Sequence, residues 1–291
     1  MNHPRSSHSR GVLLFGSRGQ IGRSVTNRVP PEKLYKILWS DVFDGDALMS
    51  KQDLEKLISK KADLSESIDV IVASGLTQSR AYPYQHQRSH FILPKMISEI
   101  FEKIPTARIL TLGSVQETQP ELCKHNSYLE SKLSWAKYVE SLSEKSIWKE
   151  RICHVRLHTV YSEDPPPHMF LGQMAAALMK DQLFEMSSGD QLREYQYRED
   201  VVDGIFRLLN QGFDQPIVEF GGNAPVSLRE IAESVFEAFG KKNLLKIGTL
   251  TAPVGETNAW KYQQTNSYYQ SPKSSTQGIV QVLKKCIQQN K

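Results

Sequence analysis

The chain has 291 residues, enough for one large domain or two small ones with a buried core. Hydrophobic residues make up 39% of it and charged residues 23%, which is the composition of a globular protein rather than of a disordered chain. A formal net charge of +4 would suit an anionic substrate. Because the lysines and arginines form no dense stripe interleaved with aromatic residues, we expect no binding to nucleic acid.

The first ten residues, MNHPRSSHSR, are polar and contain no apolar run of the kind that a secretory signal needs. We expect residues 1–10 to form a disordered leader of a cytoplasmic protein that does not bind a membrane. The cysteines Cys123, Cys153 and Cys286 are too widely spaced to predict a disulfide framework or a metal-ligand cluster. His154 and His158 have no third ligand nearby, so we predict no metal site.

Between residues 11 and 161 the sequence alternates short apolar runs with longer amphipathic segments. The expected strands are 12–15, 34–41, 68–74, 107–114 and 152–161, and the expected helices are 20–29, 53–62, 90–104 and 127–145. Strands that alternate with helices of this length favour a parallel sheet covered on both faces. We therefore predict an α/β fold with a Rossmann-type, doubly wound parallel sheet.

The last third of the chain has a mixed pattern. Helices are expected at 168–183, 199–211 and 227–240, and extended segments at 184–186, 193–197 and 217–222. The last helix has Ser227 as its N-cap, Glu230 at the capping-box position and Gly240 past its end. The polar stretch 263–277 is expected to be a loop. We predict a dinucleotide-binding domain over 11–163 and a smaller, mainly substrate-binding α/β lobe over 164–291, with segments that return to the sheet.

Three glycines stand between the first apolar run and the first expected helix, in the stretch GSRGQIG at 16–22. A strand, a glycine turn and a helix in this order let backbone amides approach a cofactor pyrophosphate, which the helix N-terminus then binds. The spacing G-x-x-G-x-x-G also occurs in turns that bind no ligand. The expected cofactor-binding residues are Gly16, Arg18, Gly19, Gln20, Ile21, Gly22, Asp41, Ser74, Gly75, Tyr128 and Lys132.

Two of these residues give opposite indications about the cofactor. Asp41, at the end of the expected second strand, could accept hydrogen bonds from the adenosine ribose, which favours NAD. Arg18, inside the glycine turn, could pair with a 2′-phosphate, which favours NADP. Both residue types are also common in ordinary turns and loops. The sequence leaves NAD and NADP open.

The segment SYLESK places Tyr128 and Lys132 four residues apart, on one face of an expected helix. An ammonium beside a phenol favours the phenolate and lowers its pKa from about 10, which suits proton exchange near neutral pH. Ser114 ends the expected strand RILTLGS, where its hydroxyl could hydrogen-bond a substrate carbonyl. Taken alone, the pair is also typical of an exposed helix face, and the serine of a turn or cap.

Together, the glycine turn, Ser114 and Tyr-x-x-x-Lys resemble the short-chain dehydrogenase/reductase superfamily. Residues 11–240 resemble its extended branch, the NAD-dependent epimerase/dehydratase family, which acts mainly on nucleotide sugars. Similar stretches are VRLHTVY at 155–161, GDQLREYQYREDVVDGIFRLL at 189–209 and VEFGGNAPVSLREIAE at 218–233.

The resemblance implies that Tyr128 is the catalytic acid/base, that Lys132 lowers its pKa and binds the nicotinamide ribose, and that Ser114 polarises the reacting carbonyl. It also implies that Ser114 and Arg193 bind the substrate, with Arg193 at the nucleotide, and that the chain forms a homodimer. A surface ion pair is the alternative for Arg193.

The chain departs from this family at two places. Ser114 and Tyr128 are only 14 positions apart, fewer than is usual in the family, and Ser89 and His90 stand near the place of its usual asparagine. The short segment favours an NAD(P)-dependent oxidoreductase that reduces a 4-keto-(6-deoxy)sugar nucleotide over a nucleotide-sugar 4-epimerase. A non-catalytic NAD(P)-binding regulator or scaffold is the alternative of another class.

Overall fold

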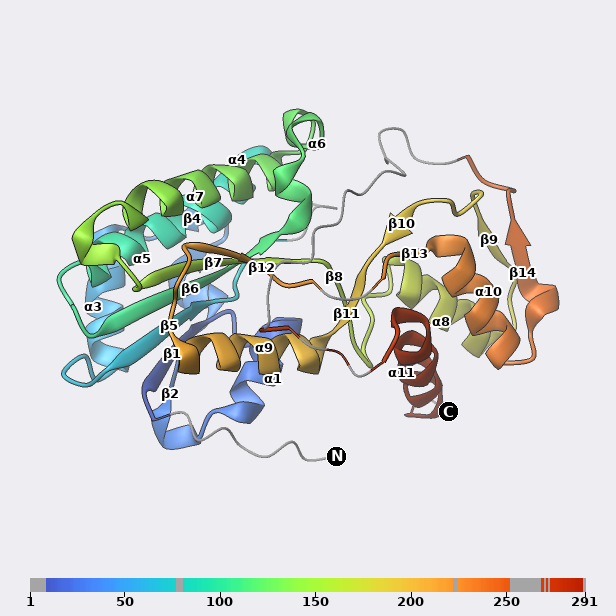
Figure 1. The fold of residues 1–291 in the computed structure, drawn as a ribbon, viewed down its shortest axis with the longest axis horizontal. Coiled ribbons are helices and arrows are strands. Elements are labelled where there is room, and N and C mark those ends of the chain that lie inside the picture. The colour runs from blue at the N-terminus through green and yellow to red at the C-terminus, as the bar shows by residue number, and fades with distance from the viewer. Residues whose placement is uncertain are drawn as a thin grey trace. The chain divides into compact units, whose positions relative to one another are not determined.

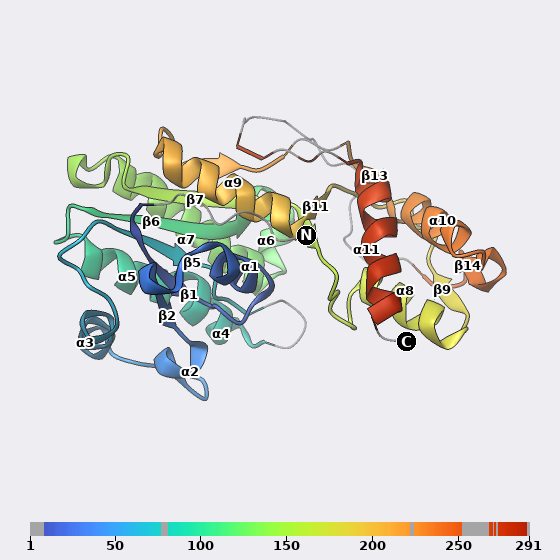
Figure 2. The same ribbon diagram turned by 90° about the horizontal axis from the view of Figure 1, so that it is seen from below.

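The computed structural model describes residues 9–76, 81–221, 224–251, 268–269, 271 and 273–289. The chain divides into two compact units. The first contains Met1–Leu157 and Val202–Phe220, and the second contains His158–Val201 and Gly221–Lys291. Figures 1 and 2 show the ribbon in two views.

A six-stranded parallel sheet forms the centre of the first unit, in the order β12-β7-β6-β5-β1-β2. Its strands are β1 (Gly11–Phe15), β2 (Leu34–Ile37), β5 (Ile68–Val72), β6 (Ala107–Ser114), β7 (Ile152–Leu157) and β12 (Ile217–Glu219). All residues of β1 and β5 are buried, as expected for strands covered on both faces. Asp69, the polar residue of β5, is paired with Arg10 and Arg108. The predicted doubly wound α/β fold is confirmed.

Helices pack on both faces of this sheet (Figure 1). One face carries α3 (Lys51–Lys61), α5 (Leu93–Phe101) and α7 (Ser127–Ser143), which share one apolar cluster with the strands. The other face carries α1 (Gln20–Arg28) and α9 (Arg198–Gln211), where Arg28 pairs with Asp203. Apolar side chains on the inward stripe of each helix explain this layering.

Several short elements connect the main ones in the first unit. They are α2 (Trp39–Val42), β3 (Phe43–Asp44), β4 (Ala47–Leu48), α4 (Pro83–Gln87) and α6 (Pro120–Lys124), with 3₁₀ turns at Pro31–Lys33, Val115–Thr118 and Ser146–Trp148. The helix expected at 90–104 is confirmed over residues 90–101, but it begins earlier: α4 leads through a π-helical turn, Arg88–Ile92, into α5. Pro94 directly follows this π-helical turn.

The second unit mixes helices with short paired strands. Its elements are β8 (Thr159–Tyr161), α8 (Phe170–Lys180), β9 (Phe184–Met186), β10 (Leu192–Arg193), β11 (Tyr195–Tyr197), β13 (Val226–Ser227), α10 (Leu228–Ala238), a 3₁₀ turn (Lys242–Leu244), β14 (Leu245–Ile247) and α11 (Ser275–Gln289). β8 pairs with β11, β9 with β14, and β10 with β13. As predicted, Ser227 caps α10 by accepting from the nitrogen of Glu230 at 3.0 Å, and Gly240 follows with a φ of +66°.

The expectations for the two ends of the chain fall largely outside the described residues. The expected leader lies outside the described residues except for residues 9 and 10, and Arg10 donates a hydrogen bond to Asp69 at 2.9 Å. The expected loop at 263–277 lies partly outside the described residues, and its last three residues begin α11, a helix that the sequence analysis did not predict. Within the described ranges, no helix is both long and apolar enough to cross a membrane.

Candidate active site

The glycine turn follows β1 beside the end of β5, where the direction of the strand order reverses. Open parallel sheets bind ligands at this point, outside the carboxyl ends of the strands. Gly16 has a φ of +87°, and a Cβ there would lie 2.6 Å from the backbone nitrogen of Ser74. A Cβ on Gly22 would lie 2.0 Å from the carbonyl oxygen of Gly16. Both positions therefore require glycine, whereas a Cβ on Gly19 would have no neighbour closer than 3.4 Å.

This turn leaves the N-terminus of α1 open to an anion. Gly19 is the N-cap, no side chain caps the helix, and its first turn contains no acidic residue. The Ser74 hydroxyl is buried and has no hydrogen-bond partner among the residues that the structure describes. Close backbone approach, an uncapped helix N-terminus and an unsatisfied hydroxyl fit the diphosphate of a dinucleotide.

Asp41 was expected at the end of the second strand, but it does not lie there. β2 ends at Ile37, and Asp41 belongs to α2, where its carboxylate accepts from the backbone nitrogen of Leu38 at 2.9 Å. The same carboxylate lies 3.7 Å from Nζ of Lys61. The backbone N–H of Gly16 donates to the carbonyl of Ile37 at 3.3 Å, so the residue that follows β2 beside the glycine turn is Leu38.

Tyr128 and Lys132 lie close together on α7, as their spacing predicts. The helix begins at Asn126, whose side-chain oxygen accepts from the backbone nitrogens of Tyr128 and Leu129 at 3.1 and 3.3 Å. Nζ of Lys132 lies 5.1 Å from the centre of the Tyr128 ring and donates to the carbonyl of Leu112 at 2.8 Å. Lys132 is only 6% exposed. The arrangement places a fixed ammonium beside the phenol.

Ser114 is the last residue of β6, and two contacts hold it. Its hydroxyl oxygen accepts from the backbone nitrogen of Gln116 at 3.3 Å, and its own N–H donates to Oε2 of Glu117 at 3.1 Å. The serine is thus a cap for the 3₁₀ turn, as the alternative interpretation expected. Because the hydroxyl acts as an acceptor in the cap, its proton remains available for donation to a ligand.

Two buried histidines that the sequence analysis did not assign to the site contact Tyr128. Their ring centres lie 5.8 Å (His86) and 5.1 Å (His90) from that of Tyr128, both edge to face. Nδ1 of His86 lies 2.9 Å from the hydroxyl of Ser127, and Nε2 of His90 lies 2.9 Å from the carbonyl of Leu76. A carbonyl only accepts, so Nε2 of His90 carries the proton and donates it.

Both imidazoles are neutral near pH 7. Burial lowers the pKa of His86, and burial together with the nearby Lys132 ammonium holds the pKa of His90 well below its ordinary value. The His90 ring also occupies the space above Gly75, where a Cβ would lie 2.2 Å from Cε1 of the ring. Gly75 is therefore required by packing against His90.

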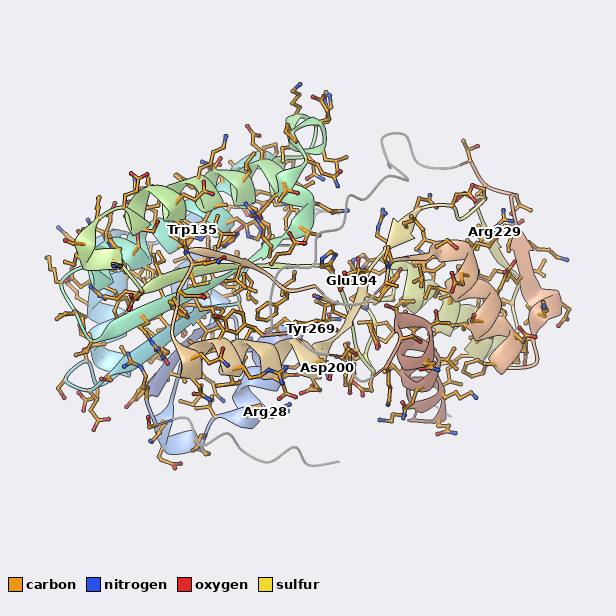
Figure 3. The ribbon with its side chains drawn as sticks, viewed as in Figure 1. Arg28, Trp135, Glu194, Asp200, Arg229 and Tyr269 are labelled. Carbon is orange, nitrogen blue, oxygen red and sulfur yellow. The ribbon has the colours of Figure 1, made fainter. Side chains whose placement is uncertain are left out.

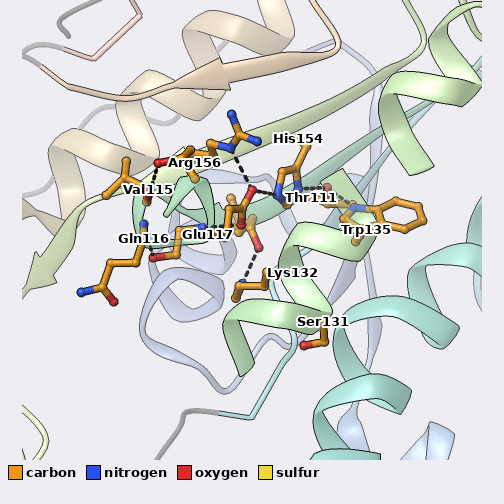
Figure 4. A network of polar contacts seen from close by, with 12 residues as sticks. Thr111, Val115, Gln116, Glu117, Ser131, Lys132, Trp135, His154 and Arg156 are labelled. Atoms are coloured by element: carbon orange, nitrogen blue, oxygen red, sulfur yellow. Dashed lines mark hydrogen bonds and ion pairs between the residues drawn. The ribbon is translucent and has the colours of Figure 1, made fainter. Parts of the chain in front are cut away.

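A second buried network surrounds Glu117, which the sequence analysis also did not assign (Figure 4). Its Oε1 accepts from Nε of Arg156 at 2.8 Å and lies 3.1 Å from Nε2 of His154. Nδ1 of His154 lies 2.7 Å from the hydroxyl of Thr111, which accepts from Nε1 of Trp135 at 2.8 Å. Trp135 lies between α7 and the sheet (Figure 3), so the network links β6 and β7 to the helix of Tyr128.

Glu117 remains ionised although it is fully buried. Burial raises the pKa of its carboxyl, but the contacts with His154 and Arg156 outweigh burial and lower the pKa to about 2. The spacing of Ser114 and Glu117 is that of a capping box, S-x-x-E, and this sequence signal could have predicted the backbone contact. Nothing local in the sequence predicts the contacts with β7.

Arg193 lies in the second unit, in β10. One of its terminal nitrogens donates to the carbonyl of its neighbour Leu192 at 2.8 Å. No group of three or more histidine, cysteine, aspartate or glutamate side chains in the described ranges is placed to hold a metal ion.

A doubly wound sheet, a glycine turn at its switch point and a Tyr-x-x-x-Lys pair on α7 define a Rossmann-fold enzyme of the short-chain dehydrogenase/reductase type. The profile of the NAD-dependent epimerase/dehydratase family matches residues 12–221. The chain belongs to this family.

Three solved structures share the fold over nearly the whole chain. A UDP-glucose 4-epimerase from Thermotoga maritima is 14% identical with a TM-score of 0.76, and the match covers 97% of this chain and 100% of that one. A dTDP-glucose 4,6-dehydratase from Bacillus anthracis, in complex with NAD, is 14% identical with a TM-score of 0.72, covering 95% and 96%. A GDP-L-fucose synthetase from Naegleria fowleri is 13% identical with a TM-score of 0.71, covering 98% and 95%.

Among curated proteins, an uncharacterized protein of Methanocaldococcus jannaschii is 33% identical over 89 residues. The match spans 30% of this chain and only 27% of the length of that relative.

Proposed function

We propose that the protein is an NADP(H)-dependent reductase of a keto group on a nucleotide-linked sugar, most simply a 4-keto-6-deoxy sugar. The observation that carries the proposal is the Lys132 ammonium 5.1 Å from the centre of the Tyr128 ring on α7. Membership of the epimerase/dehydratase family supports the reaction class. The three similar solved structures are enzymes of UDP-glucose, dTDP-glucose and GDP-L-fucose chemistry, which supports the substrate class.

In this reaction Tyr128 gives its phenol proton to the carbonyl oxygen of the sugar. The fixed charge of Lys132 stabilises the phenolate that remains, and the free proton of the Ser114 hydroxyl hydrogen-bonds the same oxygen as negative charge develops on it. The buried histidines hold the phenol ring by its edge. Tyr128 and Ser114 thus act on the same oxygen atom of the substrate.

Gly16, Gly19, Gly22 and the start of α1 at Gln20 and Ile21 would hold the cofactor diphosphate, with Ser74 and Gly75 on the opposite side. Tyr128 and Lys132 would contact the nicotinamide ribose. When bound, the reduced nicotinamide supplies the hydride that the carbonyl carbon accepts.

Asp41 bears on the choice between NAD and NADP. Its carboxylate caps α2, and the residue directly after β2 is Leu38, so among the described residues the position directly after this strand, where such a carboxylate is usual, carries an apolar side chain. Arg18 is exposed in the glycine turn, where a guanidinium can pair with a 2′-phosphate. We therefore expect tighter binding of NADPH than of NADH, and a loss of that preference in Arg18→Ala. Equal dissociation constants for the two cofactors would contradict this assignment.

Arg193 and the second unit are proposed to bind the nucleotide part of the substrate. We also propose a homodimer that packs through α7, because Tyr84 and Ile92, on the segment that contacts this helix, are 44% and 36% exposed. Light scattering of the purified protein measures the oligomeric state. A monomer at all concentrations would refute the dimer.

The decisive test is turnover. The purified protein is mixed with NADPH and a panel of 4-keto-6-deoxy sugar nucleotides, and loss of reduced nicotinamide is followed by absorbance. We expect oxidation of the cofactor in step with formation of the hydroxy sugar, and loss of both in Tyr128→Phe. An epimerase would instead retain its cofactor through purification and interconvert 4-hydroxy epimers. Cofactor binding without any turnover, unchanged in Tyr128→Phe, would indicate a regulator or scaffold.

A further inference from the structure

We propose that Glu117 is a positioning residue for the active site. Its buried carboxylate fixes the end of β6, where Ser114 lies, and balances the positive charge of Lys132. The assignment rests on the proposed roles of Ser114, Tyr128 and Lys132, and it adds a residue that touches neither substrate nor cofactor.

The last three residues of β6, which are Leu112, Gly113 and Ser114, connect the active site with the Glu117 network. The carbonyl of Leu112 accepts from Lys132, and the N–H of Ser114 donates to Glu117. Between them, Gly113 leaves the space that the network fills, because a Cβ there would lie 2.3 Å from Nε2 of His154 and 2.9 Å from Oε2 of Glu117. A shift of the carboxylate would therefore move the backbone that carries both Ser114 and the acceptor of Lys132.

The network connects Trp135 on α7 to Glu117 through hydrogen bonds on β6 and β7. The Thr111 hydroxyl accepts from Nε1 of Trp135 and lies 2.7 Å from Nδ1 of His154. The carboxylate of Glu117 only accepts, so Nε2 of His154 donates to it, and Arg156 donates to the same oxygen.

Stability alone does not require a buried carboxylate at this position. Buried ion pairs can often be replaced by apolar residues of similar volume without loss of stability. Here the charge serves an additional purpose, because Glu117 and Lys132 hold the same end of β6, through the N–H of Ser114 and the carbonyl of Leu112, and the lysine is among the charges that lower the pKa of Glu117. Without the carboxylate, the phenol would experience the lysine charge with less compensation, and its deprotonated form would be favoured.

The charged and titratable groups that face this region come from five elements: Lys132 and Tyr128 from α7, His86 and His90 from the segment before α5, Glu117 from the 3₁₀ turn, Cys123 from α6, and His154 and Arg156 from β7. A reductase needs a protonated phenol, so its rate falls as pH rises through the alkaline limb of the pH–rate profile. Removing the negative charge of Glu117 should move that limb to lower pH.

The test compares Glu117→Gln with Thr111→Val. The first variant keeps the shape of the side chain and removes the charge, and the second breaks the far end of the same network without changing the charge. We expect Glu117→Gln to lower kcat about tenfold or more, to leave the KM for NADPH within twofold, and to move the alkaline limb down by about one pH unit. Thr111→Val should lower the melting temperature and leave the limb in place. An unmoved limb in Glu117→Gln, or the same shift in Thr111→Val, would overturn the assignment.

Two further measurements keep the test independent of folding and of the substrate. If Glu117→Gln does not fold, the double variant Glu117→Gln/Arg156→Gln removes both members of the buried pair. Because the two lost charges act on the phenol in opposite directions, this variant is tested by its kcat: we expect the same loss of about tenfold, and a wild-type kcat would overturn the assignment. If the wild-type protein reduces no keto sugar, hydrogen exchange of residues 112–118 still tests the positioning role. Faster exchange at Ser114 in Glu117→Gln than in Thr111→Val supports it, and equal protection refutes it.

Discussion

A methyl group at position 75 should disturb the active site through His90. The Cβ of alanine would lie 2.2 Å from Cε1 of His90 and 2.8 Å from its Nδ1, whereas an ordinary contact needs about 3.4 Å, so the ring must retreat by roughly 1.2 Å. His90 is only 8% exposed, so its ring is packed against neighbouring residues. The retreat breaks the hydrogen bond to Leu76 and the edge contact with Tyr128. Overpacking and one lost buried hydrogen bond together predict a loss of about 2 kcal/mol in the free energy of unfolding for Gly75→Ala.

A double-mutant cycle isolates the cause. Urea unfolding, followed by tryptophan fluorescence, gives the free energies of the wild-type protein, Gly75→Ala, His90→Ala and the double variant. Once the imidazole is removed, the methyl group fits, so Gly75→Ala should be nearly neutral in the His90→Ala background and the coupling energy should be about 1–2 kcal/mol. An equal cost in both backgrounds would show that Gly75 is required for another reason, and the account of the His90 contact would be wrong.

Three more predictions concern single contacts in the two units. Gly22→Ala should abolish cofactor binding, because its Cβ would lie 2.0 Å from a backbone oxygen. In the control Gly19→Ala, the new Cβ has no neighbour closer than 3.4 Å, so the dissociation constant measured by isothermal titration calorimetry should change little. The carboxyl of Glu117 has a pKa of about 2 in the folded protein and about 4.5 in the unfolded chain. Its ionisation therefore contributes about 3 kcal/mol to the free energy of unfolding above pH 4.5, and this contribution is lost as pH falls towards 2. Urea unfolding at several pH values should show this contribution in the wild type and not in Glu117→Gln. Ser227→Ala should cost about 1 kcal/mol of stability, because it removes the N-cap of α10; a cost below 0.3 kcal/mol in urea unfolding would contradict this cap energy.

The sequence predicts the central sheet well because its strands are buried on both faces and are flanked by helices with clear apolar stripes. β1, β5 and β6 lie at or close to their expected positions. The glycine turn is equally predictable, since only glycine fits the contacts of Gly16 and Gly22. These features are local: each depends on residues within one strand, one turn or one helix.

Features that depend on distant contacts are not predictable in this way. From the sequence, Asp41 is expected at the end of the second strand, where a carboxylate could bind the ribose. In the structure β2 already ends at Ile37, and the carboxylate caps α2 instead. The sequence gives no local indication that His86 and His90 lie against Tyr128, because this contact joins α4 and the π-helical turn to a distant helix. The helix α11 is a different case: its buried residues Ile279, Leu283 and Ile287 recur every four positions, a local helical pattern that could have predicted it.

The segment between Ser114 and Tyr128 shows why its length alone is a poor guide to function. Counted as a loop, its 14 positions are merely fewer than usual in the family. In the structure the segment begins with a 3₁₀ turn that directs Glu117 into the interior, and it ends at Asn126, which caps the helix of Tyr128. Both ends of this short connection are held by hydrogen bonds: Glu117 accepts from the N–H of Ser114, and Asn126 accepts from the N–H of Tyr128. The shortening therefore need not loosen the site, because these contacts fix the serine and the tyrosine relative to the same sheet.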